Sequence, residues 1–259
     1  MTARLPHCLG IALAAVLALA APAAAASLDI AATDSDRDLW KAVMTGLYGP
    51  YDGGGKCWVG SAGADRSCMR PMRLDRVEEG GTRRLYIATG GGALSGNDCH
   101  GCAGYVGLVV LEEEGGRFRL AADNGLHEQM GAWGAAPPEE SFALHRIGPD
   151  NHGWTIESGF TGQGVTMGGQ TVHVMRGGKV AEIGRITTIF DNCGFDPDDC
   201  RSREASVTFD PASAADPYYA ATVVIDKAEP PVAETRFKVP FDKVSGRYTT
   251  PAALEKAFE

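Results

Sequence analysis

Basic residues are in short supply in this sequence. Its 24 Lys and Arg residues are outnumbered by 33 Asp and Glu, which gives a formal net charge of −9. A protein that binds nucleic acid or an anionic membrane surface needs a basic face. The deficit therefore argues against both kinds of partner. Beyond residue 26 the sequence also has no uncharged apolar run of the roughly 20 residues that a bilayer-spanning helix needs, so we expect no membrane span in the mature chain.

Familiar catalytic motifs are missing as well. Ser95 lacks the flanking glycines of a hydrolase nucleophile elbow. The run 53–56 resembles a phosphate-binding loop, but Pro50 takes the place of its first glycine and Cys57 that of the Ser or Thr. His127-Glu128 has no second histidine at the spacing of a zinc-binding helix, and no dinucleotide fingerprint follows a strand. These absences favour binding over catalysis and predict no cofactor, apart from the calcium ion considered below.

An export signal is present at the start of the chain. Arg4 provides positive charge, and the apolar run 9–21 follows it. Small residues up to Ala26 match the pattern that signal peptidases cleave. We therefore predict that residues 1–26 are a cleaved signal peptide. Residues 27–259 are expected to form a single β-rich domain that is periplasmic or secreted.

The cysteines support this compartment. An even number of them remains after the signal, and in an exported chain such a set is typical of disulfides. The cysteines lie in neighbouring pairs, and short loops cost the least entropy to close. The expected disulfides are Cys57–Cys68, Cys99–Cys102 and Cys193–Cys200.

The segment Cys99-His100-Gly101-Cys102 is the most distinctive local feature. One interpretation is a structural disulfide. A second is a redox-active thiol pair, although the strand–CxxC–helix setting of such enzymes is absent. A third is a metal site that includes His100, although a zinc site normally needs four ligands and no second CxxC accompanies this one. Ala103 excludes covalent haem attachment, which requires histidine at that position.

Hydrophobic periodicity predicts mainly β structure between two helices. Leu39, Val43 and Leu47 recur at helical spacing, so we expect an N-terminal helix at about 34–48 and a short closing helix from Pro251. The stretch 51–68 is rich in glycine and is predicted to be a loop. Adjacent hairpins with glycine turns favour an antiparallel β-sandwich, barrel or propeller-like sheet. The expected strands are 84–89, 105–111, 117–122, 141–147, 153–160, 170–176, 179–188, 205–209, 221–225 and 235–241.

Two groups of loop residues are candidate sites. The first group is acidic and is bracketed by Cys193 and Cys200. Its carboxylates offer the hard oxygen ligands that calcium prefers, although Asp and Asn are also the ordinary residues of turns. The members of this group are Asp191, Asp196, Asp198 and Asp199.

The second group contains four histidines that a β-rich fold is able to bring together, with Glu128 beside the first. Trp133 follows; its loop can present an exposed aromatic platform, but the favoured interpretation is a core residue. The candidate binding residues are His127, Trp133, His145, His152 and His173.

The leading hypothesis is a non-catalytic binding or interaction protein for an unknown small molecule or protein partner. Loops on a rigid β scaffold commonly carry recognition. The alternative is a periplasmic thiol–disulfide or metal-dependent enzyme centred on Cys99, His100 and Cys102.

Overall fold

The structure is a computed structural model that describes residues 28–63, 65–96, 99–212 and 217–258. The predicted signal peptide lies outside these ranges. Most of the described chain is β-strand, as the sequence predicts. The elements are β1 (Asp29–Ala31), α1 (Asp36–Tyr48), β2 (Tyr51–Asp52), β3 (Cys57–Ala62), β4 (Asp65–Glu79), β5 (Thr82–Ala93), β6 (Gly104–Glu114), β7 (Arg117–Asp123), β8 (Glu128–Met130), a 3-10 turn (Glu139–Ser141), β9 (Phe142–Gly148), β10 (Asn151–Gly162), β11 (Val165–Arg176), β12 (Lys179–Asp191), β13 (Ser202–Phe209), β14 (Ala221–Glu229), β15 (Arg236–Val239), β16 (Phe241–Asp242), β17 (Arg247–Tyr248) and α2 (Ala252–Phe258).

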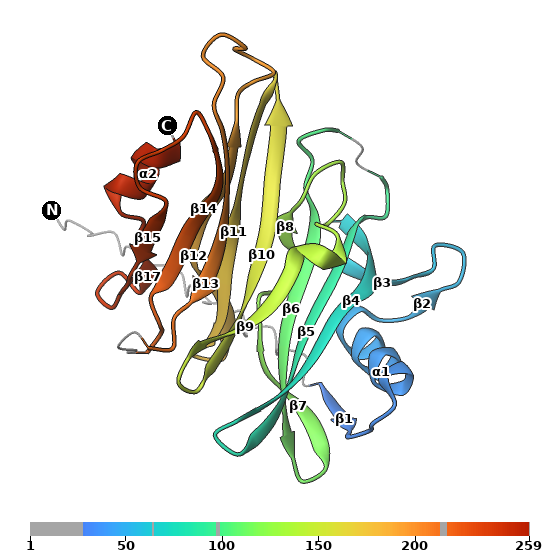
Figure 1. Ribbon diagram of the computed structural model, residues 1–259. Coiled ribbons are helices and arrows are strands. Elements are labelled where there is room, and N and C mark those ends of the chain that lie inside the picture. Colours follow the sequence, from blue (N-terminus) through green and yellow to red (C-terminus); the bar gives the residue numbers. More distant parts are fainter. Residues whose placement is uncertain (1–27, 64, 97–98, 213–216, 259) are drawn as a thin grey trace, which may run out of the picture.

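The strands form two antiparallel meanders. The first runs in the order β7-β6-β5-β4-β3-β2, with β1 paired to β7 and β8 paired to β6. The second runs β9-β10-β11-β12-β13-β14-β15. One parallel residue pair, Lys179 with Asp123, joins β12 to β7, which makes the whole a mixed sheet. In Figure 1 the first meander lies on the right and the second on the left.

Glycine turns set the hairpins. Gly177-Gly178 closes β11 and β12 with φ of 59° and 75°, positive values that glycine adopts without strain. Gln163-Gly164 closes β10 and β11 in the same way, with φ of 52° and 80°. These two-residue turns fix the register of the strands that they connect.

Helix α1 covers the outer face of the first meander. It begins at the N-cap Ser35, whose side chain accepts a hydrogen bond from the backbone N–H of Asp38. Leu39 and Val43 are fully buried and pack in a core with residues of β5, β6 and β7. The predicted helix at 34–48 is therefore confirmed to within two residues, and the short C-terminal helix is confirmed as α2.

Two further hydrophobic cores lie on opposite sides of the second meander. The first joins the meanders, because Tyr86 of β5 and Trp154 of β10 belong to one buried cluster. The second lies on the other face of β11 and β12, where strands β13 to β15 and helix α2 cover it. Leu254 of α2 is almost wholly buried in this second core. Neither α1 nor α2, the α-helices of the described part of the chain, has the length and apolar character that a bilayer crossing requires.

The loop predicted at 51–68 is wrong. This stretch contains β2, β3 and the start of β4, which continues to Glu79. Gly53, Gly54 and Gly55 form the turn between β2 and β3, whereas Gly60 lies within β3 and Gly63 in the turn that follows it. Polar residues at the start of β4 hide the apolar alternation. Pro71 also argues against a strand, but it lies at a register shift against β5, where a proline costs no regular ladder bond.

Candidate binding site

The structure contains the three disulfides that the cysteine spacing predicts. Cys57–Cys68 links β3 to β4. Cys99–Cys102 closes a short loop directly before β6, and Cys193–Cys200 closes the loop between β12 and β13. Each bridge therefore fixes a local segment rather than joining the two meanders.

Three aromatic rings stack at the surface beside the Cys99–Cys102 loop. The ring of His100 lies 4.7 Å from that of Trp133 with an interplanar angle of 34°, and 4.9 Å from that of Phe160 with an angle of 27°. Trp133 is 61% exposed and Phe160 is 47% exposed. Trp133, His100 and Phe160 are called the aromatic stack below. The favoured interpretation of Trp133 as a core residue is therefore wrong, and the exposed aromatic platform agrees with the structure.

The backbone holds Trp133 in an unusual conformation. Its φ is 54°, in the left-handed region that a residue with a Cβ rarely adopts. The N–H of Trp133 donates to the carbonyl of His100 at 3.3 Å, and that of Gly134 to the carbonyl of Cys102 at 2.8 Å. Such conformations cost about 1–3 kcal/mol and cluster at functional sites. Hydrogen bonds to the 99–102 loop thus hold Trp133 in place, although its own backbone conformation is energetically unfavourable.

Glycines of the first meander provide the surface on which the 131–136 loop rests. A Cβ on Gly92 would lie 2.1 Å from the carbonyl oxygen of Gly134, and one on Gly104 2.2 Å from the carbonyl carbon of Ala135. Both distances are far below van der Waals contact. Gly92 of β5 and Gly104 of β6 therefore allow close packing between the loop and the sheet.

Of the hollows that flank the loop, two are also lined by residues of β10. The larger of these two has a volume of about 470 Å³ and lies beside Met130. Its apolar wall includes Phe160, Met167 and Phe190, and its polar wall includes Gln129 and Arg185. We call it the main hollow. The smaller, of about 330 Å³, lies between Pro137-Pro138 and the strand segment Glu157–Gly159. We call it the edge groove.

The four histidines proposed as one site have separate partners. His127 bonds Ser67 (2.8 Å), His145 bonds Thr155 (3.0 Å), His152 bonds Glu79 (2.5 Å) and His173 bonds Glu128 (3.2 Å). Burial lowers the pKa of His127 and of His145 below the ordinary value. Ser67 has no exposed surface, so its contact with His127 offers no nucleophile to a substrate in this conformation. These four histidines, unlike His100, are not part of the aromatic stack, and their side chains form hydrogen bonds within the fold.

Two of these contacts join the meanders. Glu79 at the end of β4 bonds His152 of β10, and Glu128 of β8 bonds His173 of β11. Burial alone would raise the pKa of Glu79, but hydrogen bonds from His152, Arg84 and Tyr86 outweigh it and hold the pKa below its usual value. The same balance, with His173 as the main partner, lowers the pKa of Glu128.

Glu182 lies beside the second pair. Single ligand atoms of Glu128, His173 and Glu182 lie within 4.8 Å of one another, which is a spacing that a metal ion can bridge. Glu182 already forms an ion pair with Arg247 at 2.6 Å, and Arg185 lies 3.9 Å away. These two cations balance the two carboxylates, so a divalent ion would add charge to a neutral cluster. Sequence reasoning missed Glu182, which the register of β11 and β12 places opposite His173.

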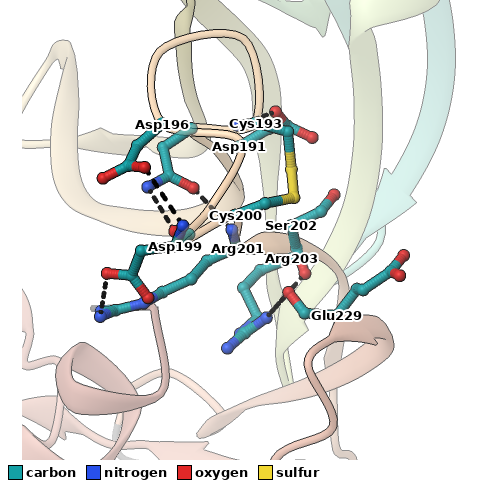
Figure 2. The surroundings of a disulfide bond; sticks show 10 residues. Asp191, Cys193, Asp196, Asp199, Cys200, Arg201, Ser202, Arg203 and Glu229 are labelled. Carbon is teal, nitrogen blue, oxygen red and sulfur yellow. Dashed lines mark hydrogen bonds and ion pairs between the residues drawn. A yellow bond between two sulfur atoms is a disulfide. The ribbon is translucent and has the colours of Figure 1, made fainter.

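The acidic loop proposed for calcium uses its oxygens internally. Oδ1 of Asp191 accepts from the N–H of Cys193, and Oδ1 of Asp196 accepts from the N–H of Asp199. Asp199 also pairs with Arg201 at 2.9 Å. Figure 2 shows these side chains spread around the loop rather than turned to one point. The geometry is that of a hydrogen-bonded turn braced by Cys193–Cys200, and the calcium hypothesis stays untested.

Comparison with known proteins adds no relative. No protein-family model, no curated protein and no solved structure matches this chain. The chemistry of the described surface is therefore the basis for a functional assignment.

Proposed function

We propose that this protein is an exported, non-catalytic binding protein that recognises its small-molecule or protein partner at the aromatic stack and the main hollow. The observation that carries the proposal is the rigid exposure of Trp133. The chain accepts a strained backbone there and gains no buried contact for most of the indole surface. Exposed aromatic residues held in a fixed geometry are typical of recognition surfaces.

The surroundings of the stack support binding. The main hollow has both apolar and polar groups on its wall, which together can hold and orient a ligand, and its volume lies within the range of ligand sites. The rings already stack on one another, and such a preformed arrangement reduces the side-chain entropy that binding costs. Export is supported by the three disulfides, which form in oxidising compartments.

A fragment screen tests the proposal. Neutral aromatic, heterocyclic and monosaccharide fragments are added to the oxidised protein, and binding is followed by NMR through the indole N–H resonance of Trp133. We expect the strongest fragments to shift this resonance and to lose at least about fivefold in affinity in Trp133→Ala, since truncating a recognition residue removes on the order of 1 kcal/mol or more. They should be recovered chemically unchanged.

The matched control is Tyr51→Ala. Tyr51 is also a half-exposed aromatic residue, at 53%, and it meets Trp58 edge to face. Fragments that respond equally to both substitutions, or that bind only away from the stack, would remove the basis of the proposal.

One observation keeps a thiol–disulfide enzyme as a second candidate. Cys99 is exposed, so a partner thiol has access to it. The segment enters β6 directly, without the helix that would stabilise a thiolate. Equilibration with glutathione buffers tests this candidate: selective reduction of Cys99–Cys102 in the range of redox enzymes would favour it, and resistance equal to that of the other two bridges would exclude it.

A further inference from the structure

The outer edge of β10 is unpaired beside the aromatic stack. Strand β9 pairs with β10 only from Asn151 to Ile156, whereas β11 pairs along the whole strand to Gly162. The segment Glu157–Thr161 therefore has a partner on one side only among the described residues. We propose that this edge binds an extended peptide segment of a partner protein, which adds a strand to the second meander. The inference rests on the proposed function and specifies its ligand.

The hairpin turn identifies the backbone groups that face outward. Gln163-Gly164 is a two-residue turn with positive φ at both positions, so the flanking residues Gly162 and Val165 form a hydrogen-bonded pair. The pairing continues to Gly153 without a register shift. Alternate residues then direct their N–H and C=O away from β11. Glu157, Gly159 and Thr161 present these groups at the free edge.

The position of two side chains supports this assignment. Thr161 lies opposite Thr166, and their hydroxyl oxygens are 2.9 Å apart. Side chains come closest in a pair that is not hydrogen-bonded through the backbone. Thr161 is therefore in such a pair on the β11 side. No backbone hydrogen bond in the described parts of the chain uses its N–H from the other side.

Space for a peptide lies along this edge. The edge groove separates Glu157–Gly159 from Pro137-Pro138, and the main hollow opens on the face that carries Phe160. The prolines have no N–H to donate, so they cannot occupy the outward carbonyl groups of the free edge. A strand that pairs with β10 would place alternate side chains on the face of the main hollow.

The surrounding charges favour a basic peptide with an apolar residue. Glu139 and Glu140 are exposed at the end of the edge groove, Glu157 is exposed on the edge itself, and the whole chain has a net charge of −9. Arg185 is the only basic residue among the described residues that line the edge groove or the main hollow. The apolar wall of the main hollow suits an aromatic or aliphatic side chain of the peptide. We infer a ligand that alternates apolar residues with lysine or arginine.

Selection from a phage-displayed library of random linear dodecapeptides tests the inference on the full oxidised protein. The key variant is Glu157→Pro with Thr161→Pro, which removes two outward N–H donors and leaves the ladder to β11 in place. Its matched control is Glu157→Ala with Thr161→Ala, which removes the same side chains and keeps both donors. We expect selected synthetic peptides to lose at least about tenfold in affinity with the proline variant and less than about threefold with the alanine variant.

Hydrogen exchange provides a direct readout in the wild-type protein. Bound peptide should slow exchange of the amide protons of Gly159 and Thr161, because these become strand hydrogen bonds. Alternate backbone nitrogens of the peptide can be methylated in two ways, at the odd or at the even positions. Only one of these two sets donates to β10, so only that methylated peptide should lose binding.

The outcomes separate this inference from the function on which it rests. Peptides that bind both variants equally but lose affinity in Trp133→Ala would overturn edge pairing and leave the stack as the binding surface. Failure to enrich any peptide, with fragments still bound at the stack, would also overturn the inference alone. Pairing of two protein copies, seen as a dimer that the proline variant abolishes, would replace the peptide with a second copy of this chain.

Discussion

Glu79 allows the sharpest test of what holds the two meanders together. Its side chain is only 2% exposed, yet it carries a charge that Arg84 neutralises, and it also forms hydrogen bonds with His152 and, at 2.9 Å, with Tyr86. Glu79→Gln keeps the shape of the side chain and removes the charge. Charge-assisted hydrogen bonds contribute about 1.5–3 kcal/mol, so we expect the free energy of unfolding at pH 7 to fall by about 2–3 kcal/mol. That is a large part of the roughly 5–15 kcal/mol of an ordinary domain.

Acid should remove this difference. The pKa of Glu79 is lower in the folded protein than its unfolded value of about 4.3, so the stabilisation is fully present above that value and is lost as the pH falls through the folded pKa. Urea denaturation followed by circular dichroism, at pH 7 and near pH 3, measures both free energies. Glu78→Gln is the control, because Glu78 is exposed on the same strand. A glutamine variant as stable as the wild type at pH 7, or equally weakened at both pH values, would refute this account.

Three further outcomes follow from the site. Trp133→Gly should be more stable to urea than Trp133→Ala by about 1 kcal/mol, because only glycine relieves the positive φ; the reverse order would remove the argument from strain. Gly92→Ala should lower the free energy of unfolding by about 1–3 kcal/mol, since its Cβ has no room against Gly134, and Gly96→Ala near it, with φ of 74° and open space around it, separates strain from collision. Glu128→Gln should weaken the fold at pH 7 and lose its effect in acid, as the lowered pKa requires, whereas an unchanged urea midpoint at pH 7 would show that the contact with His173 contributes nothing.

The sequence predicts local features well and long-range contacts poorly. Helical spacing and a capping serine locate α1, and Gly177-Gly178 locates a hairpin, because these signals depend on near neighbours alone. Strand β4 was missed because backbone pairing with β3 and β5, rather than its own residues, determines it.

The candidate site shows the same limit. Trp133 and His100 stand out as residues, but their stacking with Phe160 depends on how β10 meets two loops from the other meander. The same is true of Glu182, which only the register of β11 and β12 brings near Glu128. Nor does the sequence show that β9 ends its pairing at Ile156 and leaves an edge free.

The 131–136 loop and the glycines on which it rests differ in how well they tolerate substitution. Gly92 and Gly104 have almost no substitutes, because any side chain would push the loop off the sheet. Trp133 at the tip of the loop is mostly exposed, so exchanging that one residue would change the proposed binding surface with little cost to folding. Variants that bind new ligands are therefore best sought by changing Trp133 while Gly92 and Gly104 are kept.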